Sequence, residues 1–183
     1  MGSVALRSCM LALMAMMTAA WPAAAQRAGE YQVKAAYLYH FLNFVEWPET
    51  AFQGQGAPFE ICVFGTDPFG PDLDHVIDNK QVRGRSIRVR RSAGASPPGG
   101  CHILFIAESE RTRVHWVLES VAKQPTLTVG ELPGFEESGG MVRFIVHSDI
   151  VRLRINSRPA AEAGLKISSR LLSVATVVGQ PVR

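Results

Sequence analysis

The chain has 183 residues, of which 19 are Lys or Arg and 16 are Asp or Glu, so its formal net charge is +3 and its isoelectric point is near 9.0. This excess of positive charge is too small to indicate a nucleic-acid partner. The length suffices for one domain with a hydrophobic core, and the sequence contains no internal repeat and no low-complexity segment.

The first 25 residues have the three parts of a secretory signal peptide. Residues 1–7 carry one cation, residues 9–21 are apolar, and residues 23–25 form an A-x-A cleavage site. We therefore predict cleavage after the last of these alanines and export through the secretory pathway, which leaves residues 26–183 as one domain. An uncleaved membrane anchor is the alternative, and the shortness of the apolar stretch argues against it.

Two cysteines, Cys62 and Cys101, remain after export, because Cys9 lies in the removed peptide. In an oxidising compartment such an isolated pair favours a disulfide over two free thiols. A bond that closes a loop of this length would destabilise the unfolded chain by about 4 kcal/mol in the chain-entropy model.

The mature chain begins with a helical pattern that ends before Pro48. The apolar row that we expect to be buried contains Val33, Ala36, Tyr37, His40, Phe41, Phe44 and Val45, with Leu38 and Leu42 widening it. We interpret His40 as a packing histidine and not as a metal ligand, because no second ligand follows at helical spacing.

Residues 59–78 combine an apolar run, a break at Gly65 and a short helical pattern, which predicts a strand, a tight turn and a helix. The next strand, residues 83–91, carries five arginines, at positions 83, 85, 88, 90 and 91. We interpret this row as a solvated sheet edge that discourages strand addition, with an anionic partner as the alternative.

The remaining chain alternates strands and helices. Residues 101–106 predict a strand covered on both faces, and Ser109 is expected to cap a helix that follows it. The buried row of that helix is Val114, Val117, Leu118 and Val121. A short strand at residues 126–129 leads into a glycine-rich loop, residues 130–140, in which we expect positive φ values.

Two further strands, residues 141–147 and 150–156, predict an antiparallel hairpin joined at Ser148-Asp149. A short helix ended by Gly164 follows. A second helix, capped by Ser168 or Ser169, is expected to bury Leu171, Leu172, Val174 and Ala175. Together the elements predict a single α/β domain with a mixed, mostly parallel sheet flanked by helices, a C-terminal antiparallel hairpin and C-terminal helices.

Three carboxylates, Asp67, Glu108 and Glu131, each follow a predicted strand, so a parallel sheet would gather them at one edge. Such an edge would suit a small ligand, a divalent cation or acid-base chemistry, although acidic residues at loop starts are more often helix caps. The common catalytic motifs are absent from the sequence, including G-x-S-x-G, the Walker sequence, H-E-x-x-H and C-x-x-C. We therefore expect a binding or regulatory module with no catalytic residue, metal or cofactor.

Six segments spread over almost the whole mature chain carry a family resemblance. They are KAAYLYHFLNFVEWP (34–48), ICVFGTDPFG (61–70), CHILFIAES (101–109), LTVGELPGF (127–135), GGMVRF (139–144) and AGLKISSRLLSVA (163–175). In this order they resemble the YfiR family of periplasmic proteins. The resemblance implies a compact α/β fold, a tendency to form homodimers and no enzymatic activity.

The resemblance also implies a partner. The best-understood proteins of this type bind the periplasmic region of a membrane-bound diguanylate cyclase and repress it, which lowers cyclic di-GMP and biofilm formation. An outer-membrane lipoprotein can sequester such a repressor. A different partner, such as a sensor kinase or an outer-membrane transport complex, is the alternative, and a small-ligand binder using the carboxylate edge is another.

By the same resemblance, Cys62 and Cys101 correspond to the family's main structural disulfide, whose redox state governs the stability of the repressor. The second bridge of the better-studied members has no cysteines here. For the partner-binding surface we name two candidates: the glycine-rich loop with Phe135, and the arginine row with Arg88 and Arg90.

Overall fold

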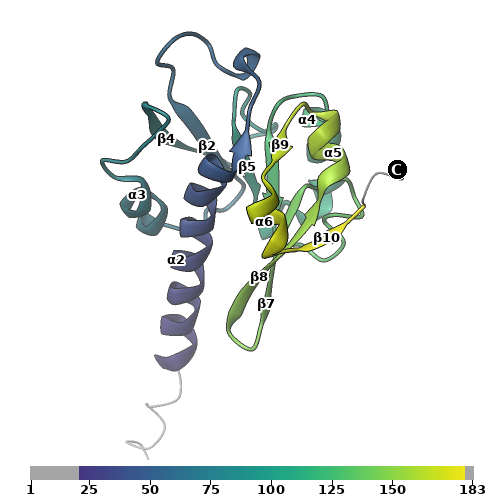
Figure 1. Cartoon of the computed structure of the whole chain (residues 1–183). Coiled ribbons are helices and arrows are strands. Elements are labelled where there is room, and N and C mark those ends of the chain that lie inside the picture. The colour runs from purple at the N-terminus through teal and green to yellow at the C-terminus, as the bar shows by residue number, and fades with distance from the viewer. Residues whose placement is uncertain (1–20, 180–183) are drawn as a thin grey trace, which may run out of the picture.

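The structure is a computed structural model that describes the backbone of residues 21–179 and the side chains of residues 29–179 (Figure 1). The main sheet has the order β10-β8-β7-β6-β5-β2-β4-β3, and β1 and β9 form a small antiparallel sheet. The main strands are β2 (Phe59–Phe64), β3 (Gln81–Val82), β4 (Arg85–Ser92), β5 (Ile103–Ile106), β6 (Leu127–Gly130), β7 (Val142–His147), β8 (Ile150–Asn156) and β10 (Thr176–Val178), and the small sheet pairs β1 (Val45–Glu46) with β9 (Lys166–Ile167). Most of the predicted signal peptide, residues 1–20, lies outside the described residues.

The pairing within the main sheet confirms the predicted α/β fold. Strands β4, β2, β5, β6 and β7 are mutually parallel, whereas β7 and β8 form the expected antiparallel hairpin. In Figure 1 this hairpin extends beyond the rest of the sheet. Its turn residues, Ser148 and Asp149, both have positive φ, as a two-residue hairpin turn requires.

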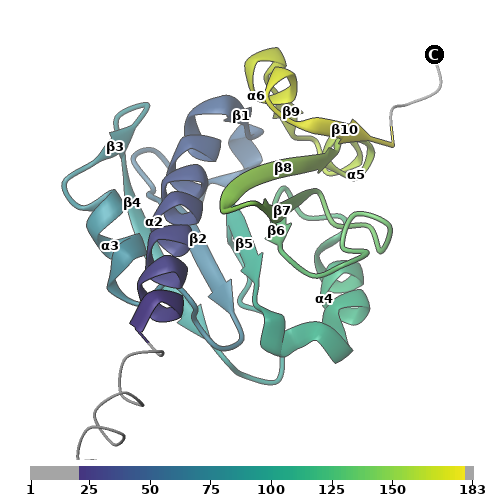
Figure 2. The same cartoon turned by 90° about the horizontal axis from the view of Figure 1, so that it is seen from below.

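Helix α2 (Trp21–Phe44) covers one face of the sheet, as Figure 2 shows. The side chains that it buries are Lys34, Ala35, Leu38, Phe41 and Leu42, and Val45 is buried directly after the helix, in β1. The predicted row is confirmed at Leu38, Phe41, Leu42 and Val45, and Tyr37 and Phe44 are partly buried against the same core. It is wrong at Val33, which is 45% exposed, and at His40, which is exposed, and it did not include the buried Lys34.

The opposite face of the sheet packs against α4 (Val114–Val121). The predicted row on this helix is confirmed, with Val117, Leu118 and Val121 buried and Val114 partly buried. A 3-10 helix, Glu108–Arg113, precedes α4, so Ser109 does not cap an α-helix as predicted. Its hydroxyl oxygen instead accepts a hydrogen bond of 2.8 Å from the backbone N–H of Thr66.

That hydrogen bond forms at the end of the central strand. After β2 the chain turns at Gly65, which has φ of 98°, and a Cβ there would lie 2.4 Å from Ser109 Oγ. Glycine is therefore required both for the backbone conformation and for the close approach. The turn leads to α3 (Pro71–Ile77), as predicted.

The C-terminal segment contains α5 (Ser157–Glu162) and α6 (Ser169–Ser173). Gly164 has φ of 76° after the first helix, and the Ser168 hydroxyl accepts from Leu171 N–H at the start of the second, as predicted. Leu171 is buried, but Val174 is 68% exposed and not buried as predicted. The chain then forms β10 parallel to β8, a pairing that the sequence pattern did not indicate.

Candidate functional site

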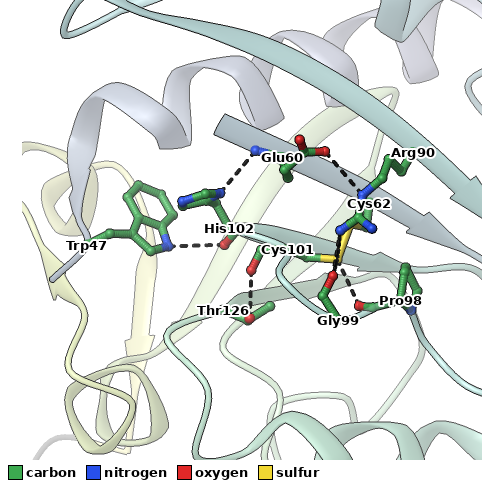
Figure 3. The surroundings of a disulfide bond; sticks show 9 residues. All are labelled: Trp47, Glu60, Cys62, Arg90, Pro98, Gly99, Cys101, His102 and Thr126. Carbon is green, nitrogen blue, oxygen red and sulfur yellow. Dashed lines mark hydrogen bonds and ion pairs between the residues drawn. A yellow bond between two sulfur atoms is a disulfide. The ribbon is translucent and has the colours of Figure 1, made fainter. Parts of the chain in front are cut away.

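The two cysteines meet in the structure as a disulfide, which confirms the predicted pairing (Figure 3). Cys62 lies within β2 and is completely buried, and Cys101 lies two residues before β5 and is 5% exposed. Because β2 and β5 are adjacent parallel strands, their chain segments bring the two Cα atoms to 5.9 Å. This separation is normal for a disulfide.

Arg90 on β4 covers the disulfide. Its Nη2 atom lies 3.4 Å from Cys62 Sγ and 3.5 Å from Cys101 Sγ, and donates a hydrogen bond of 2.6 Å to Gly99 O. Its Nε atom lies 3.1 Å from a carboxylate oxygen of Glu60. In Figure 3 the guanidinium is therefore seen between the carboxylate and the two sulfur atoms. The position of Arg90 follows from the register, since it pairs with Cys62 across the β2–β4 ladder.

His102 lies next to this cluster and is almost completely buried. Its Nδ1 accepts a hydrogen bond of 3.0 Å from Glu60 N–H, and its backbone oxygen accepts one of 3.2 Å from Trp47 Nε1. Burial, and to a lesser extent the charge of Arg85, lowers the pKa of His102 to about 4. The imidazole is therefore neutral at pH 7, and its Nε2 carries the proton.

A small cavity of about 170 Å³ opens beside the disulfide. Its lining includes the side chains of Glu60, Arg90 and His102 and the chain at Gly99 and Gly100. The segment before β2 contributes Ala51, Gln53, Ala57 and Pro58 to the lining. The cavity therefore combines a carboxylate, a guanidinium and a neutral imidazole.

The predicted carboxylate edge is divided among separate ion pairs. Asp67 lies 2.6 Å from Arg91, Glu108 pairs with Arg111, and Glu131 pairs with Lys34 on α2. Within the part of the chain that the structure describes, no group of three or more His, Cys, Asp or Glu residues is arranged to hold a metal ion. The structure thus places these carboxylates at the ends of neighbouring strands but gives each its own cationic neighbour.

The arginine row lies near the edge of the sheet and is largely exposed, as predicted, but most of its side chains also bind neighbouring segments. β4 pairs with β2 from Ile87 to Ser92, whereas on the other side only Arg85 and Ser86 pair, with the two-residue strand β3. Arg83 donates to Val45 O, Arg85 to the carbonyls of Gly54 and Ala57, and Arg91 binds Asp67 and Asp74, which raises the pKa of Arg91. With Arg90 on the disulfide, four of the five arginines connect β4 to neighbouring segments.

Arg88 differs from the other four. Its side chain is exposed and has no ion-pair partner among residues 29–179. It is therefore the member of the predicted pair, Arg88 and Arg90, that is available at the surface, whereas Arg90 is occupied beside the disulfide.

Phe135, the other predicted partner-binding residue, is completely buried. Its ring lies between Gly130 and Gly140, where an added Cβ would come within 2.6 Å and 2.2 Å of ring carbons respectively. The glycines of the loop therefore admit the aromatic ring, and two others, Gly134 and Gly139, have the expected positive φ. The side chain of Phe135 anchors the loop from within and is not on the surface that a partner would contact.

Two buried charges that sequence reasoning missed fix the same loop. Glu136, with a side chain only 1% exposed, lies 2.7 Å from Arg154 Nε and 3.5 Å from Arg143 Nη1. Lys34, with a side chain 2% exposed, pairs with Glu30 and Glu131. The i,i+4 spacing of Glu30 and Lys34 is a local signal, but Glu131 lies 97 residues from Lys34, and Arg154 lies on a strand beyond the loop that contains Glu136.

The sequence profile of the YfiR/HmsC-like family matches residues 31–176, most of the chain. The chain belongs to the YfiR/HmsC-like family. This family is known for periplasmic regulators and not for catalysts. No curated protein matches the chain.

Among residues 21–179, no helix combines the length and the apolar character that a membrane crossing needs.

Proposed function

We propose that this YfiR/HmsC-like protein is exported to the periplasm, binds the periplasmic region of an inner-membrane diguanylate cyclase and represses it. The observation that carries the proposal is the family match over residues 31–176. The Cys62–Cys101 disulfide supports the periplasm as the compartment, because such bonds persist in oxidising compartments. The expected result of repression is a lower level of cyclic di-GMP and less biofilm.

Repression of this kind requires only differential binding. The protein must bind the inactive conformation of the cyclase more tightly than the active one, and the difference in binding free energy sets how far the equilibrium moves. Moving a two-state equilibrium from 1:99 to 99:1 takes about 5.5 kcal/mol. A rigid surface supplies such a preference without any chemical step.

The protein would act as a homodimer, and an outer-membrane lipoprotein would relieve repression by sequestering it. Both statements extend the proposal from the family resemblance. They are checked by measuring the mass of the purified protein in solution by light scattering, and by asking whether an outer-membrane lipoprotein is recovered with it.

The experiment that tests the proposal is cross-linking in living cells with tagged full-length protein, followed by mass spectrometry of the captured proteins. We expect a membrane-bound diguanylate cyclase with a periplasmic region, recovered in smaller amounts with Cys62→Ser. Deletion of the gene should raise cyclic di-GMP in the same strain. Capture of a sensor kinase or a transport complex, with cyclic di-GMP unchanged, would contradict the proposal.

The exposed arginine of β4 offers a test of the binding surface. Arg88→Glu should weaken capture of the cyclase if this side of the sheet contacts it, because the substitution reverses a charge that no described residue neutralises. Arg152→Glu on β8 is the matched control, since Arg152 is also exposed and has no ion-pair partner among the described side chains. Equal capture with both variants would exclude the Arg88 surface.

A further inference from the structure

The outer edge of β4 is open along most of its length. β4 pairs with β2 from Ile87 to Ser92, but on the opposite side the short strand β3 pairs only with Arg85 and Ser86. Beyond these two residues no strand among residues 21–179 continues the sheet on that side. An unpaired strand edge of this kind can pair with an extended segment of another chain.

The backbone of β4 determines which residues offer hydrogen bonds at this edge. The carbonyl oxygen of Ser92 accepts a hydrogen bond from Gly65 N–H, so the backbone groups of Ser92 face β2. Because successive residues of a strand direct their N–H and C=O groups to opposite sides, Arg90 and Arg88 also face β2. The residues whose N–H and C=O groups face the open edge are Ile87, Val89 and Arg91. An added strand would find donors and acceptors there that the pairing with β2 does not use.

The two faces of the edge differ in chemistry. Ile87 and Val89 are half-buried and pack against the apolar core under α2. Beside Ile87 lies an open hollow of about 430 Å³, which Ile77 of α3 also lines. On the other face Arg88 is exposed and has no ion-pair partner among the described side chains, and the side chain of Arg90 is 42% exposed. A strand that alternates apolar and acidic side chains would therefore match both faces.

The charge of β4 argues against two other occupants of the edge. The strand has four arginines and no acidic residue in its sequence RSIRVRRS. A second copy of β4 would set two rows of arginines side by side, and like charges on adjacent strands are destabilising. The C-terminal residues 180–183 contain one arginine and no acidic residue, so this end of the chain does not supply the complementary charge either.

We propose that the open edge of β4 is a docking site for an extended segment of a partner protein in which apolar residues alternate with Asp or Glu. The backbone of the segment pairs with Ile87, Val89 and Arg91. Its apolar side chains lie on the side of the hollow next to α3, and its carboxylates lie beside Arg88 and Arg90. The inference does not rest on the proposed function, because it concerns the chemistry of the bound segment and not the identity of the protein that carries it.

The test uses the purified, disulfide-bonded protein and two short capped peptides, one that alternates valine with glutamate and one that alternates valine with lysine. NMR titration measures the dissociation constant of each. We expect the acidic peptide to bind about tenfold more tightly than the basic one, because only its charge complements the arginines. Equal affinities, or no binding of the acidic peptide at millimolar concentration, would overturn the proposal.

A proline in β4 tests whether the peptide pairs with the strand. Val89→Pro removes an N–H that faces the open edge and leaves the hydrogen bonds to β2 in place. We expect it to weaken binding of the acidic peptide by about tenfold or more. Val89→Ala is the matched control, because it also removes the valine side chain but keeps the N–H, and it should weaken binding less than about threefold. Binding of the acidic peptide to Val89→Pro with the wild-type affinity would contradict strand pairing.

A second measurement uses the wild-type protein, so it does not depend on the folding of the proline variant. Hydrogen exchange is followed for single amides by NMR, with and without the acidic peptide. Exchange should slow at Ile87, Val89 and Arg91, whereas the amides of Arg88 and Arg90, which already face β2, should change little. Binding without slower exchange at the first three amides would refute the docking mode, since attraction between charges would then suffice to explain it.

Discussion

Two regions border the same apolar cluster under α4, and different interactions hold them in place. At one side a covalent bond joins Cys62 to Cys101. At the other side the loop between β6 and β7 is held by the buried ring of Phe135 and by the ion pairs of Glu136. The first region depends on redox conditions, whereas the second depends on packing and on buried charge. The same fold thus holds two chain segments against one apolar cluster in two ways, one by a covalent bond and the other by packing and buried ion pairs.

Loss of the covalent bond should have the largest effect on the free energy of unfolding. The double variant Cys62→Ala/Cys101→Ala should lower the free energy of unfolding by about 4 kcal/mol, because the unfolded chain regains the entropy of an open loop. Chemical denaturation with and without a reducing agent measures it. The reducing agent should destabilise the wild-type protein and leave the double variant unchanged, and a response of the double variant would contradict this account.

Removing the buried ring should have an effect of nearly the same size. We expect Phe135→Ala to lower the free energy of unfolding by about 3–4 kcal/mol, because it leaves a cavity between Gly130 and Gly140. Denaturant titration under oxidising conditions measures the change. Since the disulfide remains intact, the decrease in the free energy of unfolding should be the same before and after alkylation of free thiols. Phe135→Leu should lower the free energy of unfolding less than Phe135→Ala does.

The buried carboxylate of the loop should contribute less. Glu136→Gln should lower the free energy of unfolding by about 3 kcal/mol, because it leaves Arg154 and Arg143 without the buried negative charge. Glu137→Gln is a matched control, since Glu137 is 61% exposed and lies 3.8 Å from the same Arg154. Its effect should stay below about 0.5 kcal/mol. Equal effects of the two variants would show that burial of Glu136 does not matter.

The smallest effect is a pH dependence near the disulfide. The pKa of His102 is about 4 in the folded protein, below the ordinary value of 6.5, so the unfolded chain binds a proton between these values that the folded protein does not. Stability should therefore fall as the pH is lowered from 6.5 towards 4, by roughly 1–2 kcal/mol at pH 5. His102→Asn, which can still accept from Glu60 N–H, should remove this component from the pH profile of the unfolding midpoint. A profile unchanged by the variant would contradict it.

Prediction from the sequence worked best where the deciding neighbours are local. The turn at Gly65, the cap at Ser168 and the hairpin turn at Ser148-Asp149 all occur where the pattern placed them. It failed for Ser109, because the hydroxyl binds Thr66, which lies 43 residues away. A helix cap can be predicted from neighbouring residues, but the sequence pattern does not show that a distant backbone N–H will occupy the capping hydroxyl instead.

The candidate site was predicted only in part, for the same reason. The cysteine pair could be found because no other cysteine remains in the proposed mature chain. The role of Arg90 could not, because an arginine on a half-exposed strand has the same pattern whether it faces solvent or sulfur. The register of β4 against β2 determines that Arg90 lies beside the sulfur atoms, and that register exists only in the assembled sheet.

The sequence by itself determined the order of the central strands and their connecting helices, the pairing of the two cysteines and the family to which the chain belongs. Apolar periodicity, glycine positions and cysteine count are properties of short segments or of composition, so they can be read directly. Only the tertiary structure decided that Lys34 of α2 is buried, where the arginines of β4 point and that Phe135 lies inside. Each of these depends on a partner that folding brings from a distant part of the chain, as Glu131 is brought to Lys34 across 97 residues.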